Sequence, residues 1–341
     1  MKKYLFASIF MLLSTVVLAQ DSTAIQGHKN NNKFKQLYEE FATPNRFRTA
    51  SGAPGVDYYQ QQVDYKMDIE LDDENTKLYG NETITYTNNS PDALPYLWVQ
   101  LDQNIRNEND MEGAKNPSAA PSFRRVESFV DEFTSEKFVG GFNIEAVKDA
   151  NGRPLRHTIN QTMMRVDLPT PLASGAQFTF SIKWWYKINN HVTDRARSGY
   201  EYFPEDDNRA YVIAQFFPRL AVYNDVEGWQ NYQFWGNGEF ALNFGNYEVN
   251  ITVPEDHIME ATGTLQNPKE VLSRTEYQRY KKALKTFDNP VMIVTQDEVI
   301  EKEKVNATKK KTWRFVAENV RDFGFATSRK FIWDMMVVNI G

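Results

Sequence analysis

The chain has 341 residues, a formal net charge of -6 and no cysteine. The lack of cysteine excludes a disulfide framework, a thiolate metal site, a cysteine nucleophile and a lipid anchor on an N-terminal cysteine. The acidic balance argues against a nucleic-acid partner, which needs a basic surface. With 41% hydrophobic and 14% aromatic residues, the chain can bury a large core.

The first 19 residues have the pattern of a secretory signal peptide. Lys2 and Lys3 precede an apolar run at 4–19, and Val17 and Ala19 are the small residues before a polar stretch. The run is shorter than the roughly 20 residues of a membrane span. The sequence therefore predicts cleavage after Ala19, with an uncleaved anchor as the alternative. We expect an exported protein, periplasmic or secreted, with no membrane span once the signal is removed.

Residues 20–56 form a polar leader with little patterning. Four of its apolar residues follow a helical spacing and predict one short helix: Phe34, Leu37, Tyr38 and Phe41. The rest of the leader is expected to wrap the surface or to stay mobile.

From Asp57 on, apolar and polar residues alternate, as in strands with one buried face and one solvated face. The alternating segments lie at 63–71, 78–88, 164–168, 178–188 and 247–253. An acidic turn at 72–75 joins the first two, and Asn151-Gly152 predicts a hairpin between Val147 and Leu155. Many short strands at regular spacing predict a sandwich or an open antiparallel barrel.

One helix is predicted in the C-terminal third. Ser273 and Glu276 have the spacing of a capping box, and Tyr277, Tyr280 and Leu284 follow at helical spacing. This helix is expected to cross one edge of the sheets, so the domain should hold one or two short helices. A charge-rich turn is expected at 302–311.

The sequence contains no motif for hydrolytic or phosphate chemistry. A helical zinc site needs histidines at i and i+4 with a glutamate beside the first, but the four histidines lie far apart, at His28, His157, His191 and His257. His157 is predicted in a hairpin strand, and His191 and His257 in loops. Ser198-Gly199 does not form a nucleophile elbow, and no phosphate-binding glycine loop occurs.

Two other sites can be weighed. The acidic loop at 205–208 offers oxygen ligands for calcium, but its spacing fits no EF-hand and favours a solvated loop. Four tryptophans could stack on sugars, although packing in the core explains most aromatic residues of such a chain: Trp184, Trp185, Trp229 and Trp235.

Four sets of residues resemble, in the same order, the first domain of zinc aminopeptidases of the aminopeptidase N type, in the form seen in exported bacterial members. They are Tyr65 to Leu71 with Gly80 to Ile84; Phe217-Pro218-Arg219-Leu220-Ala221-Val222-Tyr223 with Asp225; Glu239-Phe240 with Tyr247 to Pro254 and Ala261-Thr262-Gly263; and Trp313 to Ala317 with Val320, Asp322-Phe323 and Ala326 to Ser328. The resemblance covers 57–334. It implies a mainly β fold, a large antiparallel saddle-like sandwich domain, with 335–341 as the start of a missing catalytic domain.

The resemblance also implies a function, that of an exported metallopeptidase which removes residues from peptide N-termini. The family's zinc and amine-binding motifs, H-E-x-x-H and G-x-M-E-N, do not occur in this sequence. Zinc is therefore expected only in the complete enzyme, with no cofactor, metal ligand or catalytic residue in this chain, which should be inactive alone. Peptide would be bound through the missing catalytic domain.

One substrate-binding residue follows from the resemblance. In family members the β domain contributes a glutamine to the wall of the substrate pocket, and Gln215 is the matching residue. Its spacing to Pro218 is tighter than in better-known members, and the alternative is that Gln215 is a satisfied polar group of a strand.

Two alternative functions stay open. One is a free-standing, non-catalytic binding or scaffold domain, and the other is an unrelated β-sandwich that binds glycans. The apolar, uncapped ending at 335–341 favours a partial aminopeptidase gene product over both.

Overall fold

A computed structural model describes residues 44–107, 126, 138–194, 196–236, 241–304 and 306–340. The predicted signal peptide, most of the leader with its helix, His28 and Glu239-Phe240 lie outside these residues. The chain divides into two compact units. Unit 1 comprises Met1–Tyr58 and Asp225–Gly228, and unit 2 comprises Tyr59–Asn224 and Trp229–Gly341.

In unit 1, a partly buried ion pair joins two segments that are distant in sequence. The carboxylate of Asp225 accepts hydrogen bonds from Arg48 Nε at 2.8 Å and from Arg48 Nη2 at 3.0 Å. The guanidinium of Arg48 also lies 5.1 Å from the ring centre of Tyr58. Asp225, which belongs to the segment that resembles the aminopeptidases, therefore anchors this unit.

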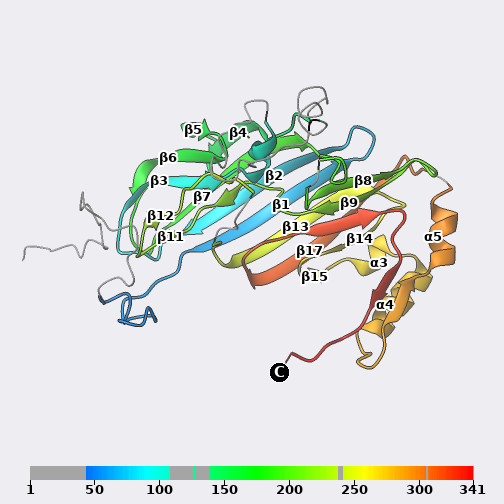
Figure 1. Cartoon of the computed structure of the whole chain (residues 1–341). Helices are drawn as coiled ribbons and strands as arrows, with labels where there is room; N and C mark the ends of the chain where they lie inside the picture. The colour runs from blue at the N-terminus through cyan, green and yellow to red at the C-terminus, as the bar shows by residue number, and fades with distance from the viewer. Residues whose placement is uncertain are drawn as a thin grey trace, which may run out of the picture. The chain divides into compact units, whose positions relative to one another are not determined.

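Unit 2 is mainly β, and its largest sheet has seven strands (Figure 1). Their order is β15-β17-β13-β1-β2-β7-β4. Their bounds are β1 (Gln62–Asp72), β2 (Lys77–Thr87), β4 (Asn143–Asp149), β7 (Gln177–Lys187), β13 (Gly245–Pro254), β15 (Thr264–Leu265) and β17 (Lys310–Val320). The burial of every second residue confirms the alternation predicted for β1, β2, β7 and β13.

One pairing in this sheet differs from the expected antiparallel arrangement. β1 runs parallel to β13, with Tyr65 opposite Tyr247, whereas the other neighbours in the sheet are antiparallel. The period of two residues is the same for both directions, so alternation cannot distinguish them. The prediction of a mainly β, antiparallel sandwich-like fold is otherwise confirmed.

Two sheets of four strands complete the sandwich. The first has the order β10-β3-β6-β5 and the second β14-β18-β9-β8. Their bounds are β3 (Leu94–Gln100), β5 (His157–Asn160), β6 (Met163–Leu172), β8 (Gly199–Phe203), β9 (Asn208–Ile213), β10 (Arg219–Leu220), β14 (Ile258–Ala261) and β18 (Phe325–Ser328). Short strands also lie at β11 (Tyr223–Asn224), β12 (Gly228–Trp229), β16 (Val291–Val294) and β19 (Trp333–Met335). The inner faces of these sheets share one core cluster with the seven-stranded sheet.

The predicted hairpin between Val147 and Leu155 is confirmed, because the amide of Leu155 donates to the carbonyl of Val147 at 2.9 Å and Lys148 pairs antiparallel with Pro154. The chain turns at Asn151-Gly152, with Gly152 at a φ of 79° and the amide of Asp149 donating to the carbonyl of Arg153. However, β4 and β5 belong to different sheets, because β5 pairs with β6. The turn residues specify the local bend, while tertiary packing decides which strand each arm joins.

The described residues contain three α-helices, one more than the upper limit predicted. They are α3 (Pro268–Val271), α4 (Arg274–Ala283) and α5 (Gln296–Lys302), grouped at one end of unit 2 (Figure 1). The capping box of Ser273 and Glu276 that starts α4 is confirmed. A second capping box, Thr295 with Glu298, starts α5. It was missed because α5 is too short for a periodic pattern. None of the helices that the structure describes could cross a membrane.

Candidate functional site

Gln215 lies in a bend between β9 and β10, outside the strands. Its φ is 51°, in the left-handed region that non-glycine residues seldom adopt. Residues with such a backbone conformation are held in it by the surrounding structure and are enriched at functional sites. The bend turns the chain out of the sheet of β9 and into the sheet of β3.

The backbone of this bend is held by the 3-10 helix η1 (Asp102–Arg106). The amide of Gln103 donates from Nε2 to the carbonyl oxygen of Gln215 at 2.9 Å. Gln103 is buried and is itself oriented by Arg106, whose Nη1 lies 3.1 Å from Gln103 Oε1. The side-chain amide of Gln215 is half-buried and makes no hydrogen bond with another residue of the described chain. Its donors and acceptor are therefore available to a ligand.

The residues after Gln215 are fixed by aromatic packing. Phe216 packs edge-on against Phe325 with ring centres 5.3 Å apart. Phe217 packs edge-on against Tyr65 at 5.3 Å and against Tyr247 at 6.1 Å. Both phenylalanines are fully buried, so the bend at Gln215 is attached directly to the centre of the core.

A buried cation completes the anchoring of this segment. Arg219 is 4% exposed and donates from Nη2 to Asp102 Oδ2 and from Nη1 to Asp322 Oδ2, the latter at 2.6 Å. Burial alone would lower the pKa of Arg219, but the two carboxylates outweigh burial and raise it. The guanidinium therefore stays charged and links β10 to η1. Neither Asp102 nor Gln103 belongs to a recognisable motif, so sequence reasoning missed both.

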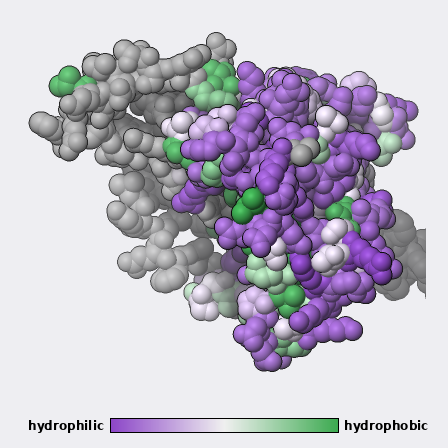
Figure 2. Space-filling view, turned by 90° about the vertical axis from the view of Figure 1, so that its right-hand side faces the viewer, coloured by the Kyte–Doolittle hydropathy of each residue, from purple (hydrophilic) through white to green (hydrophobic). Residues whose placement is uncertain are grey.

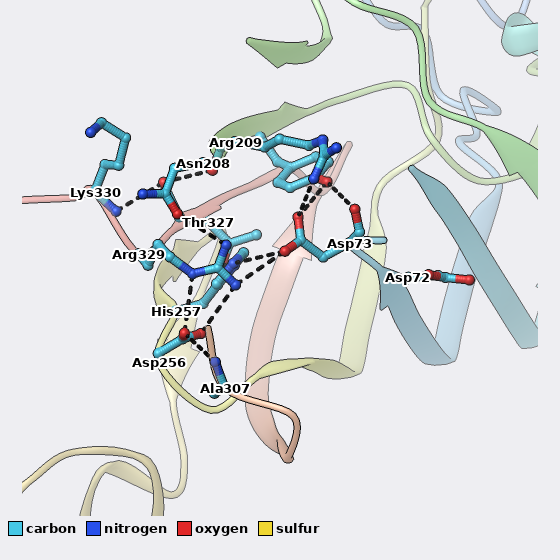
Figure 3. Close-up of polar contacts among 12 residues, drawn as sticks. Asp72, Asp73, Asn208, Arg209, Asp256, His257, Ala307, Thr327, Arg329 and Lys330 are labelled. Carbon is cyan, nitrogen blue, oxygen red and sulfur yellow. Dashed lines mark hydrogen bonds and ion pairs between the residues drawn. The ribbon is translucent and has the colours of Figure 1, made fainter. Parts of the chain in front are cut away.

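A second buried polar cluster surrounds Arg329 (Figure 3). Its guanidinium donates from Nη2 to Asp73 Oδ2 at 3.1 Å, from Nε to Asp256 Oδ2 at 3.1 Å and from Nη1 to Asn208 Oδ1 at 3.2 Å. These partners come from the β1–β2 turn, the β13–β14 loop and the start of β9. The predicted acidic turn thus contributes Asp73 to the interior, and Arg329 joins three distant connections.

His257 belongs to the same cluster and is fully buried. Its Nδ1 lies 3.2 Å from Thr327 Oγ1, whose hydroxyl donates to the carbonyl of Ile258 at 3.1 Å. Nδ1 must therefore be the donor, and Nε2 faces Asp73 Oδ2 at 4.0 Å. Burial lowers the pKa of His257 to about 4, although Asp73 opposes this shift. The imidazole is neutral near pH 7, and its role here is structural.

The other residues considered from the sequence do not converge on one site. His157 is exposed on β5, and His191 lies in a loop 3.7 Å from Glu201. In the acidic loop, Asp206 pairs with Lys330 at 2.7 Å. Trp184 is 1% exposed and belongs to the core. Among the residues that the structure describes, no group of three or more histidines, cysteines or carboxylates could hold a metal ion.

The end of unit 2 that faces the viewer in Figure 2 is mostly hydrophilic, with small separate hydrophobic areas. In the described part of unit 2, the Gln215 bend combines a left-handed backbone, a side-chain amide without a partner and support from η1. Gln161 shares this combination, with a φ of 54° and its carbonyl held by Asn104 Nδ2 at 2.8 Å, so Gln215 is distinguished from it by the family resemblance.

Comparisons with known proteins give a likeness of fold alone. No protein-family model matches the chain, and no curated protein matches it. Among solved structures, an M1 zinc metallopeptidase from Deinococcus radiodurans is similar, with 11% identity and a TM-score of 0.40, over 80% of this chain and 43% of that chain. A mutant of this enzyme bound to a Tyr-Ser-Ala substrate has 12% identity and a TM-score of 0.40, over 79% of this chain and 42% of that chain. The chain therefore spans less than half the length of these structures.

Proposed function

We propose that this chain is the N-terminal β domain of an exported zinc aminopeptidase and that Gln215 lines the pocket for the peptide N-terminus. The four sets of residues that resemble this family, in its order, support the assignment to an aminopeptidase. The observation that carries the pocket assignment is the geometry of Gln215: a left-handed backbone, a carbonyl held by Gln103 and a side-chain amide with no partner in the described chain.

This geometry suits recognition of a peptide end. The carbonyl oxygen of a glutamine side chain accepts from an α-ammonium group, and its NH₂ donates to a peptide carbonyl. Because the bend is attached to a rigid core, the backbone that carries the amide loses little conformational freedom when the amide binds. Gln215 would orient the substrate without taking part in bond cleavage.

Zinc and the hydrolytic water would be supplied by the rest of the enzyme. The described residues bring no set of zinc ligands together, and a zinc hydrolase typically uses three protein ligands with an open position for water. The proposal therefore assigns to this chain a positioning role only.

Two measurements test this proposal. The first is the nucleotide sequence after codon 341, which should continue with the family's amine-binding and zinc motifs. A stop codon directly after codon 341 would favour a free-standing binding domain instead. The second is zinc content and aminoacyl-anilide hydrolysis by the purified 341-residue chain. Stoichiometric zinc with turnover in this chain would contradict the proposal.

The role of Gln215 is tested in the complete enzyme with Gln215→Ala. Loss of a hydrogen bond to a charged group costs about 1.5–3 kcal/mol, so KM should rise roughly ten- to a hundred-fold with zinc content unchanged. Gln177→Ala is the matched control, because Gln177 is exposed on β7 and its amide binds only Thr87 Oγ1. Equal KM values for both variants would remove Gln215 from the pocket.

A further inference from the structure

Three polar side chains where β3, η1 and β10 meet are nearly fully buried. Gln100 and Asp102 are each 1% exposed, and Arg219 is 4% exposed. Gln100 lies directly opposite Arg219 in the β3–β10 register, so both side chains project from the same face of the pair. Asp102 follows two residues later and binds Arg219 through Oδ2. The three side chains therefore form one compact polar group.

Four atoms of this group have no hydrogen-bond partner among the described residues. They are Gln100 Nε2, Gln100 Oε1, Asp102 Oδ1 and Arg219 Nε. Buried polar atoms in native proteins are nearly always bonded to protein or to ordered water, because a buried unsatisfied group loses its solvation without compensation. Four such atoms on three adjacent side chains indicate a common partner.

The chemistry of the four atoms identifies the class of this partner. Gln100 Nε2 and Arg219 Nε are donors, whereas Gln100 Oε1 and Asp102 Oδ1 are acceptors. A metal cation would be repelled by the two N–H groups, and an anion would be repelled by Asp102. A water molecule donates two hydrogen bonds and accepts two, which matches this set.

We propose that Gln100, Asp102 and Arg219 form a binding site for an internal water molecule that joins β3 to β10 and η1. The water accepts from Gln100 Nε2 and Arg219 Nε and donates to Gln100 Oε1 and Asp102 Oδ1. Because Asp102 precedes Gln103, which holds the carbonyl of Gln215, the water also fixes the start of the support for the Gln215 bend. The site does not depend on the chain being part of a peptidase.

The sign of one stability change tests the site. Gln100→Met keeps the length of the side chain and removes both polar atoms. If the water is bound, the variant deprives it of two partners, and the urea midpoint of the 341-residue chain falls. If the site is dry, the variant removes an unsatisfied amide, and the midpoint rises. Leu97→Met is the matched control, because Leu97 is fully buried on the same strand and has no polar atom.

A direct measurement on the unaltered chain covers the case in which Gln100→Met does not fold. With the side-chain amide of Gln100 selectively labelled, magnetisation transfer from water to this amide should show that a water molecule stays in contact with it for a long time. A high-resolution crystal structure should place a water within hydrogen-bond distance of all three side chains. A direct bond from Gln100 to Asp102 Oδ1 or to Arg219 Nε, with no water between them, would overturn the proposal.

Discussion

Replacing Arg219 by methionine should destabilise unit 2 more than any exposed ion-pair change. Arg219→Met keeps most of the apolar stem but removes the charge that Asp102 and Asp322 share. Asp102 is 1% exposed, so its carboxylate would stay in the interior without a counter-ion. Breaking a buried ion pair by removing one partner costs about 3–5 kcal/mol, a large part of the 5–15 kcal/mol typical of a folded domain.

The loss of stability in Arg219→Met should also depend on pH. Burial already raises the pKa of Asp102 in the natural chain, although Arg219 opposes this shift. Without Arg219, the pKa of Asp102 in the folded variant lies further above its value in the unfolded chain. The unfolded state then releases its proton first, so the variant loses stability as pH rises. Urea unfolding followed by tryptophan fluorescence should therefore show a larger defect at neutral pH than at mildly acidic pH.

An exposed ion pair provides the matched control. Arg314 Nη2 lies 3.0 Å from Glu270 Oε2, and the two side chains are 54% and 59% exposed. Arg314→Met should cost no more than about 1 kcal/mol, because solvent screens the pair. If Arg219→Met costs no more than Arg314→Met, the ion pairs of Arg219 with Asp102 and Asp322 do not anchor the segment after Gln215, and the reasoning fails.

Three further predictions concern other buried groups. Burial raises the pKa of Glu82 well above its usual value, so stability should fall by up to about 1.4 kcal/mol per pH unit as pH rises above the pKa of the unfolded chain. Glu82→Gln should flatten that slope in urea unfolding, and an unchanged slope would contradict the shift. The pKa of His257 is lowered from 6.5 to about 4, so the unfolded state takes up its proton first, and stability is lost as pH falls through this interval. His257→Asn should retain more stability than the natural chain on acidification, as measured by thermal unfolding. A Cβ on Gly245 would lie 1.7 Å from the carbonyl oxygen of Val63, so Gly245→Ala should abolish soluble expression. A Cβ on Gly324 would lie 3.3 Å from its nearest backbone atom, so Gly324→Ala should express normally.

Much of the sheet structure could be predicted from the sequence, because burial of one face imposes a period of two residues. That pattern identifies β1, β2, β7 and β13. The parallel direction of the β1–β13 pair produces no distinct pattern in the sequence of either strand, so it could not be predicted. Helix α4 was predicted because its capping box precedes a periodic pattern, whereas α5 has the same box and too few residues to show a pattern.

The candidate site was less predictable, because its geometry depends on contacts between distant residues. Gln215 was selected only through the family resemblance, and its role in a pocket stays a prediction. Its support by Gln103 links positions 112 residues apart. His257 was correctly assigned to a loop, but its burial depends on Arg329 and Asp73, which tertiary packing brings to it.

The parallel pairing of β1 with β13 has a consequence for biosynthesis. β1 and β2 form a hairpin from neighbouring residues, but the other edge of β1 is completed by residues about 182 positions later, such as Asn250 opposite Asp68. At about 5–20 residues per second, a ribosome needs roughly 10 to 40 s to synthesise that interval. Such long-range pairing also folds slowly. The nascent chain therefore exposes an open strand edge for this period, and its yield in cells should depend on chaperones that cover such edges.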